Sequence, residues 1–236
     1  MNIRKAMVMA AGRGTRMRPL TETLPKPLVR LAGKPLIDHA LDRLADAGIE
    51  EAVVNVHYLA DLLVAHLAAR THPRIVVSDE RAALLDTGGG TKKALPLLGD
   101  DPVLTFNSDS VWVEGLGANL RNLMAAFDPG RMDALLMIAD AARTIGYVGR
   151  GDFTMDPAGL LARRGESTTA PYMFAGVQII KPGLFADGPD GAFSTNLIWD
   201  RLIERGRLYG HRMGGTWMHV GAPDDLAEAE AFLRDL

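Results

Sequence analysis

Apolar residues in the N-terminal half of the chain alternate between short unbroken runs and helical spacing. The unbroken runs have the length of buried strands and lie at residues 6–11, 52–56, 74–78, 102–106 and 134–138. Between them, apolar residues spaced as on one helix face predict helices over residues 35–47, 59–69, 91–98 and 116–127, the first ended by Gly48. Strands separated by single helices are joined by right-handed crossovers, so the pattern predicts an α/β fold with a mostly parallel sheet.

The pattern changes beyond residue 140. Strands are predicted over residues 147–153, 174–180 and 208–213, and helices over residues 194–205 and 224–236. Turns are predicted at Asp156-Pro157 and at Lys181-Pro182-Gly183, where residues that favour turns interrupt the apolar runs. No repeat, low-complexity tract or flexible linker separates the two halves, so we expect the second half to continue the core sheet.

The composition is that of a globular protein, because 47% of the 236 residues are hydrophobic and 23% are charged. A net charge of −3 gives no global attraction for a nucleic acid but is compatible with a local phosphate site. The lack of cysteine excludes disulfides, thiolate metal sites and a cysteine nucleophile, and it fits a reducing compartment. The longest apolar runs are too short to cross a membrane. We therefore expect a cytoplasmic protein with neither nucleic-acid nor membrane partners.

Unusual chemistry follows the first predicted strand. Gly12 and Gly14 allow the backbone to approach a ligand closely and to present N–H groups to phosphate oxygens. Lys26 stands between two prolines, which stiffen its backbone. Three arginines within six residues add fixed positive charge: Arg13, Arg16 and Arg18. This loop is expected to bind phosphate groups, and the alternative is a basic, solvated turn.

Two familiar phosphate-binding motifs do not explain this loop. Met17 occupies the third glycine position of a dinucleotide-binding fingerprint. A Walker A loop requires serine or threonine after Gly-Lys, whereas Gly33-Lys34 is followed by Pro35.

The loops after the third and fourth strands are also candidates, because parallel sheets bind ligands beyond the carboxyl ends of their strands. Glu80 and the glycines 88–90 follow the third strand, and the glycines there allow close contact with a flat ligand or a phosphate; the alternative is a flexible turn with a helix cap. Asn107 and Asp109 close the fourth strand. A carboxylate at that place suits a divalent cation shared with phosphate oxygens, and the alternative is a cap of the next turn.

The first loop resembles the signature of the sugar-1-phosphate nucleotidyltransferases. The matching residues are Ala11-Gly12-x-Gly14-Thr15-Arg16-Met17-x-Pro19-Leu20-Thr21 and Pro25-Lys26-Pro27-Leu28. The resemblance implies a Rossmann-like, glycosyltransferase-A-like fold, with a mixed but mostly parallel sheet flanked by helices and a small acceptor-binding lobe. It also implies a single domain over residues 1–236, with a nucleotide-binding part (1–140) and a sugar-phosphate-binding part (141–236). The implied reaction forms an NDP-sugar and pyrophosphate from an NTP and a sugar 1-phosphate.

The resemblance assigns roles to individual residues. The expected catalytic residues are Arg16, Lys26 and Asp109. The expected nucleotide-binding residues are Ala11, Gly12, Gly14, Thr15, Glu80, Gly89 and Asn107, with Gly89 against the nucleobase. The expected sugar-binding residues are Gly146, Glu166 and Gly176. The family often has a Glu-Lys pair in this last region, whereas this chain has Arg163-Arg164, which leaves the acceptor's identity open.

The chain also departs from the family at a metal ligand. Asp109 matches an aspartate that binds Mg²⁺, but His219 stands where the family usually has a second metal-binding aspartate. Imidazole suits Mn²⁺ better than Mg²⁺, so we expect Mg²⁺ with Mn²⁺ as an alternative; Asp224, Asp225 or a water are further candidates for the missing ligand. The lost aspartate also leaves open a non-catalytic nucleotide-sugar sensor.

Within the family, the compact chain and residues 85–90 most resemble the N-acetylmuramate 1-phosphate uridylyltransferases of cell-wall recycling. UTP is therefore the favoured nucleotide, and mannose-1-phosphate guanylyltransferase is the alternative. The oligomeric state is not predicted.

Overall fold

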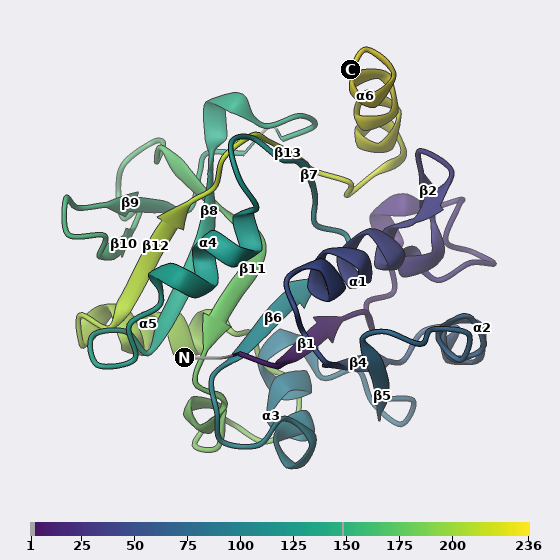
Figure 1. Ribbon diagram of the computed structural model, residues 1–236, viewed down its shortest axis with the longest axis horizontal. Coiled ribbons are helices and arrows are strands. Elements are labelled where there is room, and N and C mark those ends of the chain that lie inside the picture. The colour runs from purple at the N-terminus through teal and green to yellow at the C-terminus, as the bar shows by residue number, and fades with distance from the viewer. Residues whose placement is uncertain (1–2, 148) are drawn as a thin grey trace.

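A mixed β-sheet runs through the centre of the protein, whose computed structural model describes residues 3–147 and 149–236 (Figure 1). The spatial order of its main strands is β12-β8-β11-β6-β1-β4-β5, and the β9–β10 hairpin pairs with the beginning of β11. Its strands are β1 (Lys5–Met9), β4 (Glu51–Val56), β5 (Arg74–Asp79), β6 (Val103–Asn107), β8 (Ala134–Asp140), β9 (Phe153–Met155), β10 (Leu161–Arg163), β11 (Tyr172–Ile180) and β12 (Leu208–Arg212).

Strand directions agree with the sequence pattern. Strands β1, β4, β5 and β6 run parallel to one another, and β12 runs parallel to β8. Strand β11 is antiparallel to β6, β8 and β9. The predicted mixed, mostly parallel sheet is confirmed. Two small strand pairs lie outside it: β2 (Arg30–Leu31) with β3 (Lys34–Pro35), and β7 (Val111–Val113) with β13 (Thr216–Met218).

Helices cover both faces of the sheet (Figure 1). They are α1 (Leu36–Asp46), α2 (Ala60–Leu67), α3 (Asp86–Leu98), α4 (Asn119–Ala126), α5 (Asn196–Glu204) and α6 (Pro223–Arg234). The side chains of β1 alternate between the faces: Ala6 and Val8 pack with α1, α2 and α4, and Met7 packs with α3 and α5. Helix α6 packs beside β2 in a third apolar cluster. None of the helices in the described part of the chain is long and apolar enough to span a bilayer.

Helix α1 shows how local sequence sets an element. Its buried residues, Leu36, Ile37, Ala40, Leu41 and Leu44, follow helical spacing and face the sheet. The helix ends before Gly48, as predicted, and the Gly48 N–H donates to the Ala45 carbonyl oxygen at 2.9 Å.

Two predicted elements differ from the structure. The strand predicted over residues 147–153 is wrong: Val148 lies outside the described residues, and β9 begins only at Phe153. Gly151 has a φ of +73°, which is incompatible with an extended strand. The helix predicted over residues 91–98 starts earlier, at Asp86, so the glycines 88–90 lie inside it.

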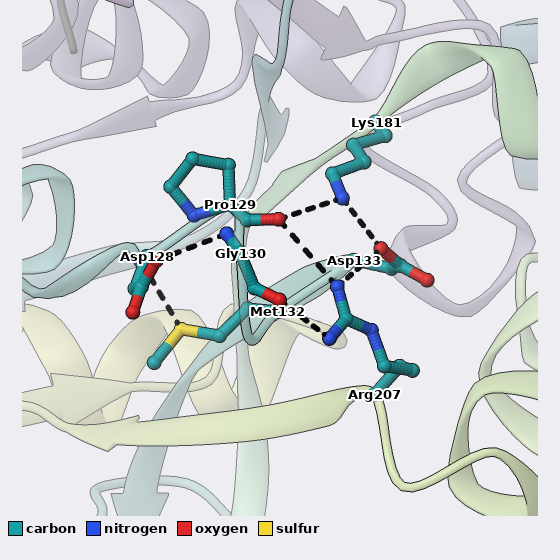
Figure 2. A network of polar contacts seen from close by, with 7 residues as sticks. All are labelled: Asp128, Pro129, Gly130, Met132, Asp133, Lys181 and Arg207. Carbon is teal, nitrogen blue, oxygen red and sulfur yellow. Dashed lines mark hydrogen bonds and ion pairs between the residues drawn. The ribbon is translucent and has the colours of Figure 1, made fainter.

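Figure 2 shows an ionic cluster. The strand bounds and pairings place it at the edge of the sheet away from the carboxyl ends of β1 and β6. The Lys181 Nζ and an Arg207 Nη both donate to Oδ1 of Asp133, at 2.6 and 3.0 Å. These residues lie just outside β11, β12 and β8, so the cluster joins three neighbouring strands. Burial alone raises the pKa of the Asp133 carboxyl, but hydrogen bonds from Arg207 and Lys181 outweigh it and lower the pKa.

Candidate functional site

A cavity of about 440 Å³ opens where the parallel strands β1, β5 and β6 end. It is called the first pocket below. It is lined by Met9, Ala10, Ala11, Gly12, Lys26, Pro27, Asn55, Glu80, Leu84, Asp86, Thr87, Asn107, Ser108, Asp109 and Ala192. Six of the predicted site residues therefore meet in one cavity: Ala11, Gly12, Lys26, Glu80, Asn107 and Asp109. They meet because the carboxyl ends of parallel strands lie at one edge of the sheet.

The glycines of the first loop have different surroundings. A Cβ added at Gly12 would meet no atom within 4 Å, so this backbone borders open space in the first pocket. Gly14 has a φ of +61°, and a Cβ there would lie 2.9 Å from Cβ of Lys26. Gly14 thus lets the loop fold tightly against Lys26, while Thr15, which is exposed, begins a short 3₁₀ turn. The structure does not place Gly14 or Thr15 in the lining of the first pocket.

Lys26 and Asp109 form an ion pair across the first pocket, between Nζ and Oδ2. The pair joins two loops that are 83 residues apart in sequence. Burial alone raises the pKa of the Asp109 carboxyl, but the charge and hydrogen bond of Lys26, aided by His219, hold the pKa below its ordinary value. Asp109 is therefore ionised at neutral pH.

His219 lies beside the first loop, next to Arg16 and Asp225. Its Nε2 is 3.5 Å from an Arg16 Nη and 3.6 Å from Oδ2 of Asp225. Burial lowers the pKa of the imidazole and outweighs the charges of Asp225 and Asp109, which raise it. The ring is thus neutral at pH 7. Within residues 3–147 and 149–236, no three histidine or carboxylate side chains are grouped closely enough to hold a metal ion by themselves.

Two buried polar side chains, Asn55 and Glu80, line the first pocket and contact each other. Glu80 is fully buried, and its Oε1 accepts a hydrogen bond from Nδ2 of Asn55 at 2.8 Å. Oδ1 of Asn55 accepts from the backbone N–H of Ala10 at 2.6 Å, and Oε2 of Glu80 accepts from that of Leu85 at 3.2 Å. The pair therefore ties β4 to the loops after β1 and β5. Sequence reasoning missed Asn55, although an asparagine within an apolar strand was a usable signal.

Gly89 does not line the first pocket, in contrast to the contact with the nucleobase expected from the resemblance. It is buried in α3, and its N–H donates to the Phe193 carbonyl oxygen at 3.1 Å. A Cβ at Gly89 would overlap the carbonyl oxygen of Gly191. Gly90 lies against the buried carboxylate, since a Cβ there would be 2.7 Å from Oε1 of Glu80. These glycines allow α3 to approach its neighbours closely.

A second pocket of about 620 Å³ adjoins the first and shares Met9, Asp86, Thr87 and Asn107 with it. The rest of its lining comes from the second half of the chain and from β6: Thr105, Asp152, Arg163, Phe174, Gln178, Ser194, Thr195, Asn196, Trp199 and Asp200. Sequence reasoning did not find this cavity, because its residues are scattered over β6, β10, β11 and α5.

The three predicted sugar-binding residues lie outside the lining of both pockets. Gly146 lies beside His219, since a Cβ there would be 3.0 Å from the His219 carbonyl oxygen. Gly176 lies behind the pockets, where a Cβ would be 2.6 Å from Oγ of Ser110 and 3.3 Å from Cβ of Asn107. Glu166 is exposed in the loop after β10.

Comparisons with known proteins agree with this geometry. A family model described as "Nucleotidyl transferase" matches residues 5–155. The chain is 52% identical to the N-acetylmuramate alpha-1-phosphate uridylyltransferase of Caulobacter vibrioides, over 98% of this chain and 97% of that protein. It is 36% identical to the enzyme of the same name from Neisseria meningitidis, over 96% and 97% of the two chains.

The fold is also that of solved nucleotidyltransferase structures. A UDP-glucose pyrophosphorylase complexed with UDP-glucose superposes with a TM-score of 0.78, at 16% identity and with full coverage of both chains. Family model, relatives and fold agree, and the chain therefore belongs to the nucleotidyl transferase family and is a sugar-1-phosphate nucleotidyltransferase.

Proposed function

We propose that the protein transfers the uridylyl group of UTP to N-acetylmuramate α-1-phosphate, giving UDP-N-acetylmuramate and pyrophosphate, as a step of cell-wall recycling. The observation that carries this proposal is the 52% identity, over nearly the whole chain, to a relative that bears this activity in its name. The two adjoining pockets support it, because one can accept a nucleotide and the other a sugar.

In this reaction an oxygen of the sugar phosphate attacks the α-phosphorus of UTP, and the bond to the β-phosphate oxygen breaks. The attacking oxygen is already anionic at neutral pH, so no side chain has to act as nucleophile or general base. The protein has to align the two substrates and compensate the charge of the leaving pyrophosphate. Arg16 and Lys26 supply positive charge on the first loop, and the Lys26 ammonium, which Asp109 holds in place, has further N–H donors for phosphate oxygens.

A divalent cation fits this site when substrate phosphates complete its coordination. Asp109 supplies an ionised carboxylate and His219 a neutral imidazole. Two protein ligands are too few for a site held by the protein alone, in line with the lack of a larger cluster among the described residues. A bound cation would supply further charge compensation for the phosphates.

The choice of cation provides a test of His219. Chelation of divalent cations is expected to abolish turnover, and both Mg²⁺ and Mn²⁺ are expected to restore it. The variant His219→Asp is expected to raise the ratio of the Mg²⁺ rate to the Mn²⁺ rate by about tenfold, because a carboxylate suits Mg²⁺ better than an imidazole does. Steady-state rates under each cation measure this ratio, and His72→Asp, at an exposed position, is the control. An unchanged ratio in His219→Asp and His219→Ala would exclude His219 as a ligand.

The proposed reaction is tested by pyrophosphate release. UTP, GTP, dTTP, CTP and ATP are each paired with the 1-phosphates of N-acetylmuramate, N-acetylglucosamine, glucose and mannose. The expected result is turnover with UTP and N-acetylmuramate 1-phosphate at a kcat/KM at least tenfold above every other pair. Preference for GTP with mannose 1-phosphate would instead establish a guanylyltransferase. Nucleotide binding without turnover of any pair would indicate a sensor.

A further inference from the structure

The second pocket contains one cationic side chain among the described residues that line it, Arg163. We propose that Arg163 binds the carboxylate of the acceptor's lactyl ether and so selects N-acetylmuramate 1-phosphate over sugar phosphates that lack this group. The proposal rests on the proposed function, in which the acceptor is an acid. It adds a specificity-determining residue in the second pocket.

Arg163 is held firmly in place. Its Nε donates to Oδ1 of Asp200 at 2.8 Å, and its Nη2 donates to Oδ1 and to the backbone carbonyl oxygen of Asn196, at 2.9 and 3.4 Å. The guanidinium carbon lies 5.0 Å from the ring centre of Phe153 and 5.6 Å from that of Trp199. A guanidinium fixed by these hydrogen bonds and two aromatic rings loses little entropy when it binds an anion.

The contacts of Arg163 leave donors of its guanidinium available. The group has five N–H donors in a planar fork, and Asp200 and Asn196 engage those of Nε and Nη2. Nη1 donates to neither of these two residues, and its two N–H groups can bind a carboxylate oxygen. Arg163 is therefore able to bind an acceptor carboxylate without releasing α5.

The position of Arg163 fits the shape of the acceptor. Asn107, Asp86 and Thr87 line both pockets and so mark where they meet, whereas Arg163 lines only the second. The phosphate on C1 of the acceptor has to reach the first pocket, near Asp109. The lactyl ether is on C3, which C2 separates from C1, so with the phosphate near Asp109 we place the ether in the second pocket, where Arg163 lies.

The other charged side chains of the second pocket are carboxylates, so binding of an anionic acceptor depends on Arg163. Asp86, Asp152 and Asp200 also line the second pocket. Oδ1 of Asp86 accepts from the Thr87 N–H at 2.6 Å, and Oδ2 of Asp152 accepts from the backbone at 2.9 Å. These carboxylates suit sugar hydroxyl groups, but without Arg163 they would repel a carboxylate. A neutral sugar would not experience this repulsion.

The experiment compares two acceptors that differ only in the lactyl ether, N-acetylmuramate 1-phosphate and N-acetylglucosamine 1-phosphate. Arg163→Met is expected to lower kcat/KM for the first by about 30- to 100-fold, mainly through KM, and to change the second by less than about threefold. Arg163→Lys, which keeps the charge but not the fork, is expected to give an intermediate loss. Arg164→Met, at the neighbouring position outside both pockets, is the control and is expected to change neither.

Two further measurements keep the result unambiguous. The affinity for each acceptor is measured by calorimetry with a non-hydrolysable UTP analogue present. This measurement compares the two acceptors even if N-acetylglucosamine 1-phosphate is not turned over. Melting temperatures show whether loss of the Asp200 contact disturbs folding. An equal loss for both acceptors would show that Arg163 only joins β10 to α5, and would overturn the proposal. Failure of the wild-type protein to use N-acetylmuramate 1-phosphate would instead overturn the proposed function.

Discussion

The variant Asp109→Asn is expected to lower kcat by about three orders of magnitude while leaving the protein folded. Asp109 is the ionised carboxylate opposite Lys26 in the first pocket, and asparagine has nearly its shape without its charge. The loss removes the anionic cation ligand and the group that positions the Lys26 ammonium. Both effects act on the phosphates during transfer, so they are expected to appear in kcat more than in the KM for UTP.

Pyrophosphate release at saturating substrates measures this effect, and Asp101→Asn, at an exposed position before β6, is the matched control. A double-mutant cycle with Lys26→Met extends the test. Because the two side chains form one ion pair, their effects are expected to be strongly non-additive. A decrease of less than tenfold in Asp109→Asn would exclude Asp109 from the catalytic machinery.

The variant Gly89→Ala is expected to lower the melting temperature by about 2–12 °C. Alanine is favoured over glycine within a helix by about 1 kcal/mol, which alone would stabilise α3. At this position the added methyl group would overlap the backbone carbonyl oxygen of Gly191, which cannot move as a flexible side chain can. Relief of that overlap requires α3 to shift, at a cost of about 2–4 kcal/mol, so the destabilising effect prevails.

Thermal unfolding followed by circular dichroism measures the shift. Gly183→Ala is the control, because a Cβ at Gly183 would meet nothing within 4 Å and its φ is not positive. This control is expected to keep the wild-type melting temperature within about 2 °C. If Gly89→Ala instead kept the wild-type melting temperature and had a raised KM for UTP, Gly89 would contact the nucleotide and would not be required for the packing of α3.

Helix α3 illustrates where sequence reasoning reached its limit. Three successive glycines are unfavourable in a helix, so local propensity placed its start after them. The structure includes them because Gly88, Gly89 and Gly90 allow α3 to lie against Phe193, Gly191 and Glu80. Tertiary packing overrides propensity here, and no local signal reports which partner lies on the other side.

The sequence by itself determined the features that lie within single segments. The apolar periodicity predicted the α/β sheet, and the places of Gly12, Lys26 and Asp109 after strands indicated that they meet, because the carboxyl ends of those strands lie at one edge. Tertiary structure decided the features that join distant segments. Asn55 meets Glu80 across 25 residues, Arg163 meets Asp200 across 37, and Arg16 meets His219 across 203. Side-chain contacts of this kind depend on how the elements pack on the sheet, which periodicity and motif spacing do not encode.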